Sequence, residues 1–186
     1  MGSSYYYFVA SLPLVSFDGK MPMSVEAFHE DCRRLLTEKD YALMQRLWVS
    51  DENDLSGTGN RVLDAWLFFD RGFRNELAWH RANRLNKDPL KYLRGPRVLD
   101  PLYAEEVSRI FKMEDLWEAE KTLNKMKWRF LEDLAAGHYF DIEFLLIYAL
   151  RLTMLERFQE YASPAGGDFA RELRTMPLPK SSLASA

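Results

Sequence analysis

Apolar residues recur at helical spacing along most of this chain. The predicted helices lie over residues 24–36, 40–48, 61–86 and 141–161, and two more begin near residues 101 and 116. Ser24 suits the N-cap of the first helix, and the Asp100-Pro101 pair is a typical cap followed by proline at the first helical position. Gly137 is expected to lie just beyond the end of the helix that begins near residue 116. The pattern therefore predicts an all-α fold.

The last long helix is poor in charge. Between residues 142 and 155 only Glu143 and Arg151 are charged, so this helix is apolar almost all round. A helix of that kind is packed on several sides. We expect it to lie in the core of the bundle.

The N-terminal residues have a different pattern. Residues 5–12 are a run of aromatic, β-branched and small side chains that ends at Pro13. Such a run favours a strand or an extended arm, and a lone strand needs a partner. We predict a short extended arm over residues 1–22.

Two phrases of the sequence occur twice. Phe-Asp-x-x-Phe begins at Phe69 and again at Phe140, and residues 36–41 resemble residues 111–116 at a similar offset. The repetition predicts two diverged copies of one helical module, over residues 23–98 and 99–176, packed into one elongated or compact bundle. Asp70 and Asp141 are expected to be equivalent N-caps. A disordered tail is predicted over residues 177–186.

Composition narrows the class of protein. The chain has 186 residues, a net charge of −3 and a single cysteine, Cys32, which excludes a disulfide framework. No stretch of the sequence is long and apolar enough for a predicted membrane span, and no signal peptide is recognised. We expect a soluble, cytoplasmic protein.

One segment departs from the acidic balance of the chain. Between residues 71 and 97 eight cationic side chains accompany only Glu76 and Asp88. The segment is either a solvated helix face or an interface for an acidic partner, since charge complementarity guides docking. The candidate interface residues are Arg71, Arg74, Arg81, Arg84, Lys87, Lys91, Arg94 and Arg97.

Two other functions are open to a helical chain of this kind. A helical di-metal carboxylate enzyme needs two Glu-x-x-His pairs, but only Glu26-x-x-His29 has that spacing, and Glu76 precedes His80 by four. His138 lies at a helix junction, outside any such spacing. We therefore expect no metal, no cofactor and no catalytic residue.

An RNA-binding helical adaptor is the second alternative. Trp79 and Tyr92 are interleaved with the cations of residues 71–97 and could stack on bases. The net acidity of the whole chain disfavours nucleic acid as the partner.

Three segments resemble known families. Residues 35–41 (LLTEKDY) and 140–152 (FDIEFLLIYALRL) resemble phrases of the C subunit of V/A-type rotary ATPases, which is named the d subunit in the eukaryotic enzyme. The opening YYYFVASLP, residues 5–13, is similar to that of an uncharacterised bacterial family encoded among V-type ATPase genes. The C subunit has an Asp-x-x-Asn helix, whereas Phe73 stands three residues after Asp70 here.

The resemblance implies a function that is not catalytic. The C subunit connects the central shaft of the ATPase to the membrane ring of proteolipid subunits, so both are the expected partners. The protein would then be peripheral to the inner face of the membrane, held there only through the complex. The C subunit has three modules, whereas this chain has the length for two.

Overall fold

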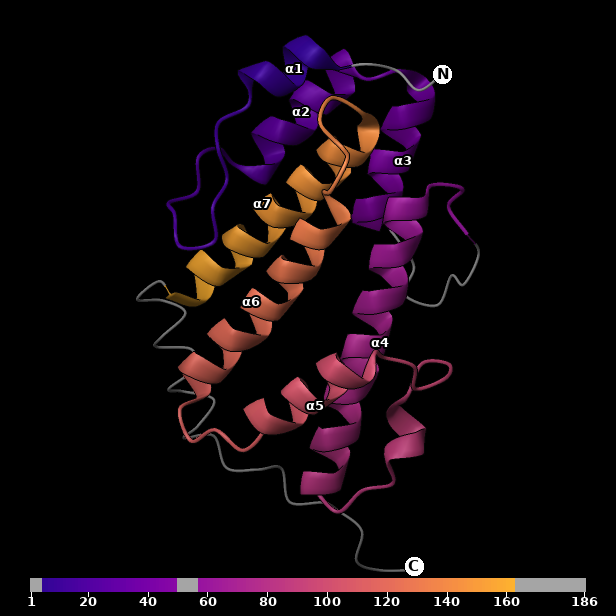
Figure 1. The fold of residues 1–186 in the computed structure, drawn as a ribbon, viewed down its shortest axis with the longest axis vertical. Helices are drawn as coiled ribbons and strands as arrows, with labels where there is room; N and C mark the ends of the chain where they lie inside the picture. Colours follow the sequence, from indigo (N-terminus) through magenta and orange to yellow (C-terminus); the bar gives the residue numbers. More distant parts are fainter. Residues whose placement is uncertain (1–4, 50–56, 163–186) are drawn as a thin grey trace, which may run out of the picture.

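The computed structural model describes residues 5–49 and 57–162, and all of its regular elements are helical. Figure 1 shows them as an elongated bundle. Within the described residues there is no strand, so the predicted all-α fold is confirmed. The elements are α1 (Tyr6–Ser11), α2 (Val25–Leu35), α3 (Glu38–Val49), α4 (Arg61–Arg84), the short 3₁₀ helix η1 (Pro89–Tyr92), α5 (Pro101–Ile110), α6 (Leu116–Leu134) and α7 (Ile142–Ala162).

Side-chain caps set where several helices begin. The Ser24 hydroxyl accepts from the backbone N–H of Ala27 at 3.1 Å, which confirms the predicted start of α2. Asp100 caps α5 with Pro101 at its first position, also as predicted. At the start of α4, Asn60 accepts from two backbone N–H groups through its side-chain oxygen.

The predicted extended arm over residues 1–22 is not confirmed, and it is wrong over residues 6–11, which form the helix α1. A helix places Tyr5 and Phe8, three residues apart, on one face that turns inward. The Tyr5 hydroxyl donates to Asp40 Oδ2 at 2.5 Å, and the Phe8 ring stacks on Phe28 at 5.9 Å between centroids. A strand would have turned these two side chains to opposite faces. The tertiary contacts thus override the β-favouring composition.

The helix α7 lies at the centre of the bundle, as its lack of charge predicts. It contacts α2, α3, α4 and α6. One face joins a cluster with Phe28 of α2, and the other joins a cluster with Phe73 of α4 and Leu131 of α6. Both clusters therefore contain residues from both predicted modules.

The predicted equivalence of Asp70 and Asp141 is wrong, and the repeat is not confirmed. Asp141 accepts from the backbone N–H of Phe144 at 3.0 Å and caps α7. Asp70 instead lies well inside α4, where Lys127 and Arg74 each bind its carboxylate at 2.7 Å. Burial raises the pKa of Asp70, but these two cations outweigh it and hold the pKa below its usual value. The shared phrase therefore lies at the start of α7 but in the interior of α4.

The predicted disordered tail, residues 177–186, lies outside the described residues. Among the helices that the structure describes, none is both long enough and apolar enough to cross a membrane.

Candidate partner-binding surface

The predicted cationic segment folds back on itself. After α4 the chain turns, and residues 87–99, which we name the strap, run alongside the C-terminal half of α4 (Figure 1). The closest approach is at Gly72, where a Cβ would clash with the Val98 carbonyl oxygen. Glycine is therefore required at this position for the strap to lie against α4.

A single amide side chain holds the strap in place. Asn75 is buried, and its Nδ2 donates to the carbonyl oxygens of Arg94 at 3.1 Å and Pro96 at 3.2 Å. Its Oδ1 accepts from the backbone N–H of Arg94 at 2.9 Å. Three hydrogen bonds satisfy this buried amide, as burial requires.

An ion pair between a buried carboxylate and a partly exposed arginine joins the strap to α4 next to this amide. Glu76 is only 3% exposed, and Arg97 binds it with two nitrogens at 2.7 and 2.6 Å. His80 lies 3.2 Å from the same carboxylate, and the Arg97 guanidinium lies 4.4 Å from the centre of the Trp79 ring. Hydrogen bonding to Glu76 raises the pKa of Arg97. This two-point geometry is typical of a structural contact.

The structure thus divides the eight predicted interface cations. The Arg74 side chain pairs with Asp70 and the Arg97 side chain with Glu76, whereas Arg94 is bound to Asn75 through its backbone. Arg71 is partly buried on α4. The remaining four side chains are exposed and form no ion pair within residues 5–49 and 57–162; they are Arg81, Arg84, Lys87 and Lys91.

Apolar surface lies beside these cations. A hollow of about 340 Å³ lies on one side of the last turn of α4, and a second of about 210 Å³ lies on the other side. Arg81 and Leu85 line both hollows. Leu85 is 64% exposed, and Leu116, which lines the larger hollow, is 58% exposed. Exposed apolar surface that is rimmed by polar or charged side chains is typical of a surface that binds another protein.

We name this surface the cationic end of the molecule. It consists of Arg81, Arg84, Leu85, Lys87, Lys91 and Leu116. The cations were predicted from the sequence, but the two leucines were missed. For Leu85 a signal was present in the sequence, because it directly follows Arg84 at the end of the helix predicted over residues 61–86.

Comparison with protein-family models shows which family the chain belongs to. Residues 53–176 match the model of a family described as "Protein of unknown function (DUF2764)". The chain belongs to this family. No curated protein and no solved structure matches the chain. The matched part of this DUF2764 protein contains α4, the strap, α5, α6 and α7, and so includes the cationic end.

The Glu–His pairs considered for a di-metal site have other contacts in this DUF2764 protein. His29 lies 3.0 Å from the Tyr41 hydroxyl and packs edge-on against Trp48. Both oxygens of Glu76 are bound by Arg97. His29 and Glu76 are therefore each in contact with side chains other than the partner of the Glu–His pair.

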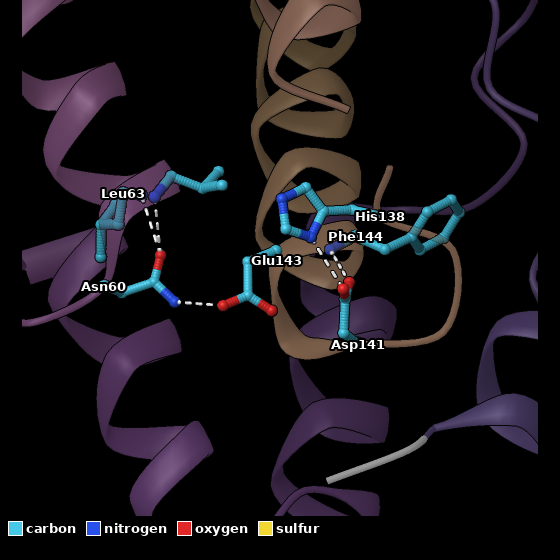
Figure 2. Close-up of polar contacts among 7 residues, drawn as sticks. Asn60, Leu63, His138, Asp141, Glu143 and Phe144 are labelled. Atoms are coloured by element: carbon cyan, nitrogen blue, oxygen red, sulfur yellow. Dashed lines mark hydrogen bonds and ion pairs between the residues drawn. The ribbon is translucent and has the colours of Figure 1, made fainter. Parts of the chain in front are cut away.

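Another group of potential ligands was not predicted from the sequence. His138, Asp141 and Glu143 each offer an atom within 4.8 Å of the others (Figure 2). His138 Nδ1 lies 2.7 Å from Asp141 Oδ2, and Asn60 Nδ2 donates to Glu143 Oε1 at 2.9 Å. A turn brings the three together, so helical spacing could not predict the group. Their hydrogen bonds stabilise the start of α7 and tie it to the start of α4.

This arrangement predicts the effect of a cap variant. Asp141→Ala removes the acceptor for the Phe144 N–H and the partner of His138, so we expect it to lower the free energy of unfolding by about 1–2 kcal/mol. Asp141→Asn keeps a capping oxygen and is expected to lower the free energy of unfolding by less. Urea unfolding of both variants measures the difference. Equal stability of Asp141→Ala and the wild type would contradict a capping role.

Proposed function

We propose that this protein is a non-catalytic connector of a V/A-type rotary ATPase, coupling the central shaft to the membrane proteolipid ring. The resemblance of residues 35–41 and 140–152 to the C subunit of that ATPase motivates the choice of complex. The observation that carries a binding function is the cationic end, where four unpaired cations among the described residues lie beside exposed leucines. Charge of one sign next to apolar surface suits a protein partner of opposite charge.

A connector needs two contact surfaces, and exposed aromatic side chains at the other end of the molecule are the candidate for the second. Tyr6 and Tyr7 of α1 are exposed next to Tyr139 and Phe140 of the turn before α7, with the Tyr6 and Phe140 rings 4.8 Å apart. Exposed aromatic side chains are enriched in protein interfaces. The α1 end and the C-terminal end of α4 lie at opposite ends of the long axis (Figure 1). This spacing supports binding of one partner at each end.

A connector must also be stiff, because torque that bends it is not transmitted. The helix α7 contacts four other helices along its length, and the strap is fixed to α4 by Asn75 and Glu76. Close-packed interiors have low compressibility and transmit strain.

The RNA-binding alternative has less support. One face of the Trp79 ring is covered by the Arg97 guanidinium, so this indole is not free to stack on a base from that side. Tyr92 is the remaining exposed ring beside the cations. A titration with single-stranded RNA at increasing salt would reveal this function if it existed.

Reversing charge at the cationic end tests the proposal. In the Arg81→Glu/Arg84→Glu variant we expect copurification with the shaft and ring subunits from solubilised membranes to fall about tenfold or more, since like charges then oppose at the interface. The stability of the variant should change by less than about 0.5 kcal/mol, because both arginines are exposed and form no ion pair in the described part of the chain.

The matched control reverses two arginines elsewhere. Arg33→Glu/Arg34→Glu makes the same change of net charge on the exposed face of α2. We expect this control to copurify as the wild type does. Equal losses in both variants would show a general effect of charge and no specific interface. Collapse of the melting temperature in the first variant would show that Arg81 and Arg84 are structural.

A further inference from the structure

The larger hollow at the cationic end has walls of different character. It lies where the last turn of α4 meets the end of α5 and the first turns of α6. Its floor is apolar, formed by side chains that include Ile110, Phe111, Met113 and Leu123. Leu85 and Leu116 stand at its two edges and are largely exposed. We name this hollow the α4–α6 groove.

The groove is open at its edges, and this openness favours a larger partner over a small molecule. A pocket for a small molecule encloses most of the ligand surface. Here the edge leucines are 64% and 58% exposed, so a small ligand on this floor would stay in contact with water. Apolar side chains that project from a larger partner would instead cover the floor and the edge leucines together.

Charge is distributed unequally between the two long walls. Arg81 and Arg84 form the α4 wall, and neither has an ion-pair partner among the described residues. The α6 wall carries one carboxylate, Glu120, which already accepts from Asn124 Nδ2 at 3.3 Å. A partner with negatively charged side chains along the α4 wall would therefore complement the charge of the groove.

The helix dipole explains only part of this arrangement. Cations in the last turn of α4 complement the partial negative charge of the helix end. The dipole gives no reason for an open apolar floor beside those cations. An apolar floor with one cationic wall is the complement of an amphipathic helix that has carboxylates along one flank.

We propose that the α4–α6 groove binds one amphipathic helix of a partner protein, with apolar side chains on the floor and Asp or Glu side chains facing Arg81 and Arg84. This assignment rests on the proposed connector function, of which it specifies one contact. The unequal walls also set the orientation of the bound helix about its own axis, because its acidic flank must face α4 and its neutral or basic flank must face Glu120.

A selection from a displayed peptide library tests the assignment. The library consists of helices with leucine at i, i+3, i+4 and i+7 and random residues on both flanks, and it is selected on the immobilised full chain. We expect the selected helices to be enriched in Asp and Glu on one flank. Selection on the Arg81→Glu/Arg84→Glu variant should enrich Lys and Arg on that flank instead.

Two measurements make the result decisive. A synthetic peptide from the first selection should bind the wild type at least tenfold more tightly than the charge-reversed variant by fluorescence anisotropy. It should also bind Leu116→Ser more weakly, and because Leu116 is 58% exposed we expect this variant to keep the fold, which circular dichroism checks. The control Arg33→Glu/Arg34→Glu should bind as the wild type does. Selected helices without charge preference, or peptides that bind the reversed variant equally well, would overturn the assignment, as would binding of single-stranded RNA but of no helix.

Photo-cross-linking separates failure of this assignment from failure of the connector proposal. A benzophenone side chain at position 116 of the full chain, in its own cell, should cross-link to an acidic amphipathic helix of an ATPase shaft or ring subunit. Cross-links to such a helix in a protein outside the ATPase would support the groove and contradict the connector. Cross-links to an ATPase segment without that character would support the connector and contradict the groove.

Discussion

Arg97→Ala is expected to lower the free energy of unfolding by about 3 kcal/mol. The substitution leaves the Glu76 carboxylate buried with His80 as its remaining side-chain partner, and breaking a buried pair by removing one partner typically costs 3–5 kcal/mol. We expect the low end of that range because the Arg97 side chain is itself 37% exposed. Urea unfolding followed by circular dichroism measures the change.

A double-mutant cycle shows whether the ion pair is the cause. In a Glu76→Gln background the buried charge is gone, so Arg97→Ala should cost markedly less than it does in the wild type. Arg97→Lys keeps the positive charge but loses the two-nitrogen contact, so its free energy of unfolding should lie between those of the wild type and Arg97→Ala. If Arg97→Ala costs the same in both backgrounds, the stabilisation comes from packing of Arg97 on Trp79 and not from Glu76.

Phe28→Ala is expected to lower the free energy of unfolding by about 3–5 kcal/mol, which is more than we expect for Arg97→Ala. Phe28 is completely buried, and its ring contacts Phe8 of α1 and Tyr148 of α7 at 5.9 and 5.0 Å between centroids. Removing the ring leaves a cavity at the contact of three helices, and cavities of this kind are destabilising in addition to the lost burial. Thermal unfolding measures the loss, with Phe28→Leu as the milder control.

The same variant also tests the corrected view of the N-terminus. Because Phe8 stacks on Phe28, Phe28→Ala should loosen α1, so amide hydrogen exchange should rise in residues 6–11 beyond the global effect. Unchanged protection of these residues relative to the rest of the molecule would show that α1 does not depend on the contact.

The helices were well predicted from the sequence because their signals are local. The caps at Ser24 and Asp100 and the nearly uncharged residues of α7 act within one or two turns, so they can be recognised without the fold. The helix α1 could not be predicted in this way. Apart from Ala10 its residues have low helix propensity, and the helix is stabilised by the contacts of Tyr5 and Phe8 with partners distant in the chain.

The candidate site was predicted only in part for the same reason. Counting charges identified the eight cations of residues 71–97, but it could not show that the Arg97 side chain binds Glu76 or that Asn75 binds the backbone of Arg94. Those contacts join positions about twenty residues apart through the strap. The close approach of Val98 to Gly72, and the contact of His138 with Asp141 in the turn before α7, likewise depend on tertiary structure.

A connector of the V/A-type ATPase must lie between the shaft and the proteolipid ring. Electron cryomicroscopy of the intact ATPase, purified from the protein's own cell, shows which chain occupies that position. We expect density for this helical bundle between the shaft and the ring, with the cationic end of the molecule in contact with one of them. A complete complex in which another chain fills that position, with this protein absent, would contradict the connector function.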